Sequence, residues 1–221
     1  MPTITRLEPD RRRGRTRLEV DGVERGALPD AVVASRRLRQ GLPVDESELA
    51  QILREAAFAE ALESALHCLA YRARSRMELV RHLRGKSHTE EAIEFAATRC
   101  EKLGYLDDLS FSRSFVRDRV RLRPRGRFRL RQELMAKGVS AEVAEAAISE
   151  VLAEQGTSER EMLRRVAAGR ARVLESTGTD TARRRLTSWL LRRGFARDAI
   201  RDVVNELVPE DDTDRPPGSI V

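Results

Sequence analysis

The feature that most constrains the fold of this chain is a helical unit that occurs three times. Each copy has two leucines four residues apart, a basic residue, a turn position and a second apolar helix. The leucine pairs and turns are Leu79 and Leu83 with Lys86-Ser87, Leu130 and Leu134 with Lys137-Gly138, and Leu186 and Leu190 with Arg193-Gly194. A repeat at this interval predicts stacked helical units that share a core and present a long surface to a partner, and it argues against a single catalytic pocket.

The apolar pattern predicts an all-α repeat protein, with three helices in each repeat. A small β-rich segment precedes the repeats. We expect a β-hairpin and short helix over residues 1–44, repeats over 45–104, 105–155 and 156–208, and a disordered acidic tail over 209–221. Low aromatic content, 4%, and high charge, 35%, suit a helical protein of small layers better than a large single-cored enzyme.

The β-rich segment is predicted from alternation around a turn. Residues 16–20 alternate up to Asp21-Gly22, and residues 23–28 form the returning strand. Asp-Gly favours a type I′ turn because both central residues need positive φ. We expect a hairpin or a three-stranded ribbon, which needs a helix to pack on.

Caps and breaks set the helix bounds. Asp45 and Glu48 form a capping-box pattern before a long helix that runs to about Ala73. Further helices are expected over 76–85, 90–103, 127–137, 141–154, 158–175, 180–193 and 197–208, with another that begins after Asp107 or Asp108. Ser87 stands where the other repeats have glycine, which should weaken the end of its helix.

Motifs for catalysis or cofactor binding are missing from the sequence. There is no phosphate loop, dinucleotide fingerprint, H-E-x-x-H, C-x-x-C or G-x-S-x-G. Cys68 and Cys100 fall on apolar helix faces and read as buried thiols, and Asp107-Asp108 reads as a helix cap. We therefore expect no enzymatic activity, no cofactor and no metal.

From the hydropathy pattern we expect a cytoplasmic protein. No apolar run approaches the ~18 residues of a membrane span, and the N-terminus lacks the apolar core of a signal peptide. No contact with a membrane is expected.

An unbroken alternation of arginines is the sharpest electrostatic signal. The residues are Arg117, Arg119, Arg121, Arg123, Arg125, Arg127, Arg129 and Arg131, and within the run only Asp118 offsets them. A break at Pro124–Gly126 should put them around one exposed corner between two helices. Such a corner can bind a phosphate backbone or an acidic protein groove, or it can be a solvated face whose Arg stems cover the core. Phe111, Phe115 and Phe128 fall at core-like positions, so base readout is not expected.

A second basic group lies at the corresponding corner of the first repeat. It consists of Arg72, Arg74 and Arg76. Lys137 belongs with the Arg run, at the far end of the same predicted helix. All of these residues are candidates for binding a protein partner or a phosphate backbone.

Three segments together resemble the RecX regulatory proteins of bacteria. They are R-x-R-S-x-x-E-L at 72–79, G-Y-L-D-D at 104–108, and residues 127–138, which end E-L-M-A-K-G. The resemblance covers about 60–208. It implies tandem three-helix repeats in an elongated, curved array. It also implies binding to RecA filaments on single-stranded DNA and inhibition of their ATPase, strand exchange and growth, and some family members bind DNA as well.

From this resemblance we expect a monomeric modulator of RecA that regulates recombination, DNA repair and the SOS response. A protein that binds DNA directly and without sequence preference, acting without RecA, is the alternative. A structural scaffold whose basic face is merely solvated is a third possibility.

Overall fold

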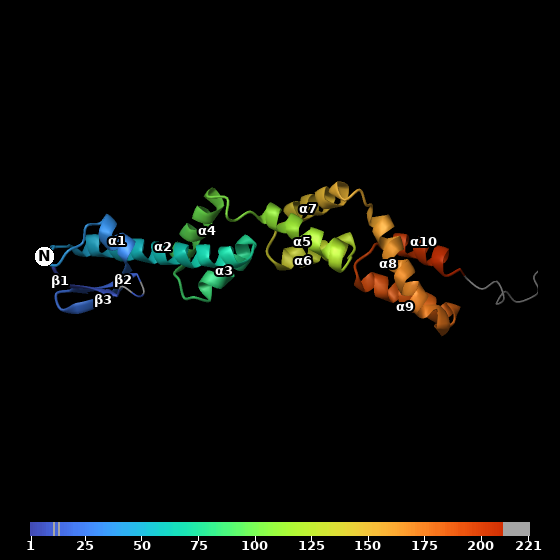
Figure 1. Cartoon of the computed structure of the whole chain (residues 1–221), viewed down its shortest axis with the longest axis horizontal. Coiled ribbons are helices and arrows are strands. Elements are labelled where there is room, and N and C mark those ends of the chain that lie inside the picture. Colours follow the sequence, from blue (N-terminus) through green and yellow to red (C-terminus); the bar gives the residue numbers. More distant parts are fainter. Residues whose placement is uncertain (11, 13, 210–221) are drawn as a thin grey trace, which may run out of the picture. The chain divides into compact units, whose positions relative to one another are not determined.

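A computed structural model of the chain describes residues 1–10, 12 and 14–209. The chain divides into two compact units, Met1–Asp107 and Asp108–Val221. The described residues form a small sheet and ten α-helices, and Figure 1 labels these elements along the chain. The expected tail over 209–221 lies, apart from its first residue, outside the described residues.

The first unit begins with a three-stranded antiparallel sheet in the order β1-β2-β3. Its strands are β1 (Ile4–Asp10), β2 (Arg15–Val20) and β3 (Val23–Pro29). Asp21 and Gly22 have φ of 49° and 74°, as the predicted Asp-Gly turn requires. The inward side chains of the sheet share a core with the short helix α1 (Asp30–Ser35) and the start of α2 (Glu46–Tyr71). The sheet is thus stabilised by helices, as a small sheet must be.

Helix α2 continues from that core into a second one, where it packs with α3 (Arg76–Arg84) and α4 (Glu90–Lys102). Side chains of Asp45, Ser75 and Thr89 accept hydrogen bonds from backbone N–H groups in the first turns of α2, α3 and α4, respectively. Small residues such as Ala61, Ala65, Ala96 and Ala97 are fully buried, so α2 and α4 approach closely.

Six α-helices surround one core in the described part of the second unit. They are α5 (Asp108–Leu122), α6 (Arg127–Ala136), α7 (Ala141–Glu154), α8 (Glu159–Leu174), α9 (Thr179–Arg192) and α10 (Arg197–Leu207), and a 3₁₀ turn, η1 (Glu175–Thr177), lies between α8 and α9. We propose that α5–α7 and α8–α10 are successive repeats with the boundaries predicted above.

The three leucine pairs are equivalent in the structure. All six leucines are fully buried. The second leucine of each pair accepts a hydrogen bond through its carbonyl oxygen from the residue five positions later, namely His88 (3.4 Å), Val139 (3.2 Å) and Phe195 (3.5 Å). The residue before each donor has positive φ, 62° at Ser87, 86° at Gly138 and 80° at Gly194. Each copy therefore ends its helix with the same left-handed turn.

The left-handed backbone of Ser87 predicts that glycine at this position would stabilise the protein. Its φ of 62° is strained for an L-residue, and no side-chain hydrogen bond is found for it among the described residues. Ser87→Gly should stabilise α3 and α4 by roughly 0.5–1 kcal/mol, since relief of strain exceeds the entropy of glycine in the unfolded chain. Amide hydrogen exchange in these helices measures the gain. Ser114→Gly, at an exposed position inside α5, is the control and should destabilise its helix by about 0.5 kcal/mol.

The predicted fold class is confirmed as helical repeats behind a small antiparallel sheet. One core assignment was wrong. Phe111 is buried, but Phe128 is 59% exposed on α6, because Leu130 and Leu134 supply the buried face of this short helix. None of the described helices has the length and apolar character needed to cross a membrane.

Candidate interaction surfaces

The predicted Arg run follows the end of α5, the connection 123–126 and the start of α6. The structure pairs most of its members with carboxylates. Arg117 contacts Glu154 at 2.8 Å, Arg119 contacts Glu133 at 2.9 Å, Arg125 contacts Glu133 at 3.1 Å, Arg129 contacts Glu133 at 3.2 Å, Arg127 contacts Glu145, and Arg121 lies 4.0 Å from Asp118. The run is thus largely part of an ion-pair network.

Glu133 is the centre of this network. Its side chain is only 16% exposed and forms ion pairs with three guanidinium groups, those of Arg119, Arg125 and Arg129. One carboxylate among three cations leaves a local excess of positive charge. Arg119 also lies over the Phe115 ring, 4.6 Å from its centroid, and this cation–π contact fixes its side chain.

Arg117 belongs to a second, recurring pattern. Arg54–Glu91, Arg113–Glu150 and Arg117–Glu154 each join the first helix of a repeat to its last helix at one constant sequence separation. The third repeat has counterparts in Arg160–Asp202 and Arg164–Glu206. These arginines brace helix pairs inside each repeat.

The break at Pro124–Gly126 is not the exposed corner predicted from sequence. Gly126 is buried, and its N–H donates to the Arg193 carbonyl at 2.8 Å. Arg193 in turn donates to the Pro124 carbonyl at 2.7 Å and stacks 4.0 Å from the Trp189 ring centroid. Burial and the nearby charge of Arg125 lower the pKa of Arg193. The turn after α9 therefore covers the centre of the corner.

In the part of the chain that the structure describes, three arginines of the run have no strong carboxylate partner and are free to bind a partner molecule. Arg121 has only the weak contact with Asp118, and Arg123 and Arg131 have no carboxylate partner among the described residues. Exposed apolar side chains lie close to them in sequence: Leu122 (67% exposed), Phe128 (59%) and Met135 (47%). Phe128, Arg131 and Met135 recur at i, i+3 and i+7 and so share one face of α6. We use the name α6 surface for the six residues at the end of α5, in the connection and on α6, namely Arg121, Leu122, Arg123, Phe128, Arg131 and Met135.

The remaining predicted site residues differ in their contacts. Arg72 pairs with Glu78 at 3.0 Å, and Arg76 pairs with Glu94 and Glu101 at 2.6 and 2.9 Å. The Lys137 ammonium lies 5.7 Å from the Phe115 ring centroid. Arg74 has no ion pair or hydrogen bond among the described residues, and its Nε is buried.

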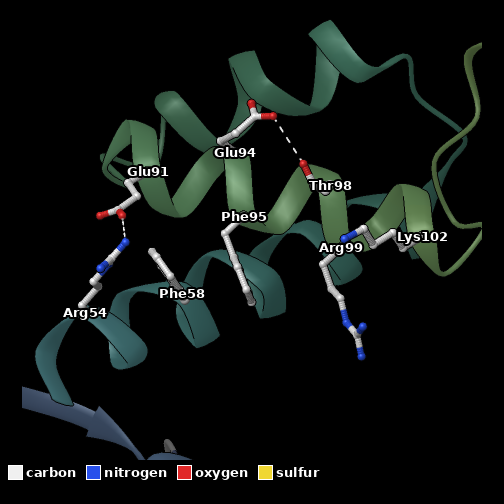
Figure 2. Close-up of a pocket in the computed structure, with 8 residues that line it drawn as sticks. All are labelled: Arg54, Phe58, Glu91, Glu94, Phe95, Thr98, Arg99 and Lys102. Carbon is white, nitrogen blue, oxygen red and sulfur yellow. Dashed lines mark hydrogen bonds and ion pairs between the residues drawn. The ribbon is translucent and has the colours of Figure 1, made fainter. Parts of the chain in front are cut away.

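An open groove of about 740 Å³, which was not predicted from the sequence, lies between α2 and α4. Figure 2 shows the rings of Phe58 and Phe95 side by side in it, and they stack with centroids 4.5 Å apart. The Arg54–Glu91 ion pair lies at one end, and Arg99 and Lys102 lie at the other. The helical spacing of the groove residues on α2 and on α4 is visible in the sequence. The contact between the rings of Phe58 and Phe95, however, depends on how α2 packs on α4.

Cys68 and Cys100 are buried free thiols, as predicted, and burial raises the pKa of both. Within the described ranges, no three His, Cys, Asp or Glu side chains form a group that could hold a metal ion.

The helical repeats match two family models. Residues 61–100 match the first three-helix domain of RecX, and residues 107–148 match the second. A regulatory protein RecX of Prosthecochloris aestuarii is 35% identical over 149 residues, which cover 67% of this chain and 94% of that protein. The chain belongs to the RecX family. It thus shares the regulatory role for which the family is named.

Other RecX proteins extend the match over the whole sequence. A regulatory protein RecX of Lactobacillus delbrueckii subsp. bulgaricus is 27% identical over 221 residues, covering 100% of this chain and 80% of that protein. A crystal structure of a regulatory protein RecX has a TM-score of 0.70 at 22% identity and covers 92% of this chain and 98% of its own. RecX from Lactobacillus salivarius has a TM-score of 0.61 at 22% identity, over 68% of this chain and 96% of its own. The two structures establish a shared fold.

Proposed function

We propose that this protein binds the RecA filament on single-stranded DNA and inhibits its ATPase, strand exchange and extension. Membership in the RecX family carries the proposal, because the sequence resemblance implied this partner and the match to both three-helix domains supports the resemblance. In this account the protein is a cytoplasmic monomer without catalytic activity, and it regulates recombination, DNA repair and the SOS response.

The α6 surface has the composition of a protein interface. Aromatic, Met and Arg side chains are enriched where proteins bind each other, since they combine a large contact area with few charges that must be desolvated. Phe128 and Met135 would supply apolar anchors, and Arg121, Arg123 and Arg131 would supply cations that no carboxylate neutralises strongly. The Arg residues bound to Glu133 would act mainly through folding.

Charge reversal at the free arginines tests this surface. Arg121→Glu/Arg123→Glu/Arg131→Glu should weaken binding to the RecA–DNA filament about tenfold or more, since each exposed charge contributes on the order of 0.2–1 kcal/mol. Co-sedimentation with preformed filaments at low salt measures the affinity. The wild type should also lose affinity as salt shortens the Debye length to ~8–10 Å, and the variant should lose less.

A matched control separates this local effect from net charge. Arg165→Glu/Arg172→Glu/Arg192→Glu changes the charge equally at exposed positions on α8 and α9. It should bind filaments with nearly wild-type affinity. Equal weakening by both triple variants would show that the effect comes from overall charge and not from the α6 surface. Binding to bare single-stranded DNA that equals binding to the filament would favour the alternative, a DNA-binding protein that acts without RecA.

A further inference from the structure

A cationic hollow of about 610 Å³ lies in the first unit. One face of α2 forms its floor through Ser64, His67, Cys68 and Tyr71, which recur at helical spacing. Arg74 from the α2–α3 connection, His82 from α3 and Lys86 from the following turn close the sides. The volume is within the usual range for a pocket that binds a small molecule or a nucleotide.

The charges of this hollow are poorly compensated. Its arginine from β2, Arg15, is neutralised by Glu60 at 2.6 Å. Arg74 and Lys86 have no ion pair among the described residues, and Glu63 is the only carboxylate that lines the hollow there. The neighbours of Arg74 in sequence, Arg72 and Arg76, both have glutamate partners. The hollow therefore holds two cations against one anion.

We propose that this hollow is a binding pocket for a phosphate group. The planar guanidinium of Arg74 can donate two parallel hydrogen bonds to phosphate oxygens, and Lys86 adds a mobile positive charge. His67 and His82 supply further ring N–H donors. Tyr71 is 86% exposed at the edge of the pocket, where a nucleobase attached to the phosphate could stack on its ring. The phosphate comes either from a nucleic-acid backbone or from a free polyphosphate.

Histidine protonation gives this pocket a characteristic response. Burial, together with the charges of Arg74, Lys86, His67 and His88, lowers the pKa of His82. Bound phosphate would supply a negative charge and so raise the pKa of His82. Glu63 and the Arg15–Glu60 pair are present both in the free protein and in the complex, so they do not account for this change. The complex then binds more protons than the free protein, so affinity rises as pH falls through the region between the two His82 pKa values.

Two probes and a pair of variants test the pocket in the full-length protein. Inorganic pyrophosphate and a fluorescent oligothymidylate are titrated at low salt, and the His82 ring signal is followed by NMR. Arg74→Gln/Lys86→Gln should lower the affinity for whichever probe binds the wild type at least tenfold. It should also abolish the change in the His82 ring signal that binding causes. The control Arg39→Gln/Arg81→Gln removes equal charge at exposed positions outside the pocket and should change affinity less than threefold.

Each outcome of this test is decisive once circular dichroism shows both variants folded. Pocket-dependent binding of the oligonucleotide alone assigns the site to a phosphodiester backbone. Pocket-dependent binding of pyrophosphate assigns it to free polyphosphate. Equal losses in the two double variants, or no binding of either probe at millimolar concentration, would overturn the proposal. The test contains no RecA, so its result is independent of the proposed regulatory function.

Discussion

Gly126→Ala is expected to destabilise the second unit by about 3 kcal/mol or more, a large effect for the addition of one methyl group. A Cβ at this position would lie 2.2 Å from the Gly194 oxygen and 2.4 Å from the Phe195 nitrogen. Both are backbone atoms, which cannot rotate away as a flexible side chain would. The α5–α6 corner must therefore separate from the turn after α9, with loss of the Gly126–Arg193 hydrogen bond. Fluorescence of Trp189, which contacts Arg193 in this turn, follows unfolding in denaturant.

The same substitution at Gly169 is the matched control. Gly169 lies inside α8 and a Cβ there would meet no atom within 4 Å. Gly169→Ala should stabilise the unit by about 1 kcal/mol, because alanine has the higher helix propensity. A Gly126→Ala variant as stable as the wild type would mean that the two turns do not approach each other as described.

Leu134→Ala and Leu190→Ala should each cost roughly 2–5 kcal/mol. Both side chains are fully buried in the core of the second unit, and each precedes the left-handed turn of its repeat. The cost combines lost apolar burial with the cavity that remains. Leu122→Ala, at a position 67% exposed, should change the free energy of unfolding by no more than about 0.5 kcal/mol. Near-neutral results at both core leucines would contradict the structural equivalence of the repeats.

Local signals in the sequence were sufficient to predict most of the fold. Apolar spacing and capping residues such as Ser75, Thr89 and Ser140 placed the helices to within a few residues. The Asp21-Gly22 turn predicted the hairpin for the same reason, because its chemistry acts over neighbouring residues. The unusual Ser87 was also identified from the alignment of the three turns.

The candidate site was harder to predict because its contacts are distant in sequence. The run from Arg117 to Arg131 looked uncompensated, since Glu145 and Glu154 lie on α7 and approach it only in the folded chain. Glu133, four residues after Arg129, was a local signal of pairing. No local signal showed that Gly126 would pack against Gly194, and so the corner was wrongly placed in solvent. Arg54–Glu91, Arg113–Glu150 and Arg117–Glu154 have one constant separation in sequence. This pattern was a signal that these arginines pair with glutamates of a neighbouring helix.

ATP turnover by the cognate RecA on single-stranded DNA, with RecA and DNA held constant, tests the proposed function most directly. The account predicts that turnover falls as the wild-type protein is added, at amounts that scale with the RecA filament and are too small to coat the DNA. It also predicts that the Arg121→Glu/Arg123→Glu/Arg131→Glu variant needs about ten times more protein for the same inhibition. Turnover that stays unchanged, or that falls only when the DNA is coated and recovers on adding DNA, would contradict a direct action on the filament.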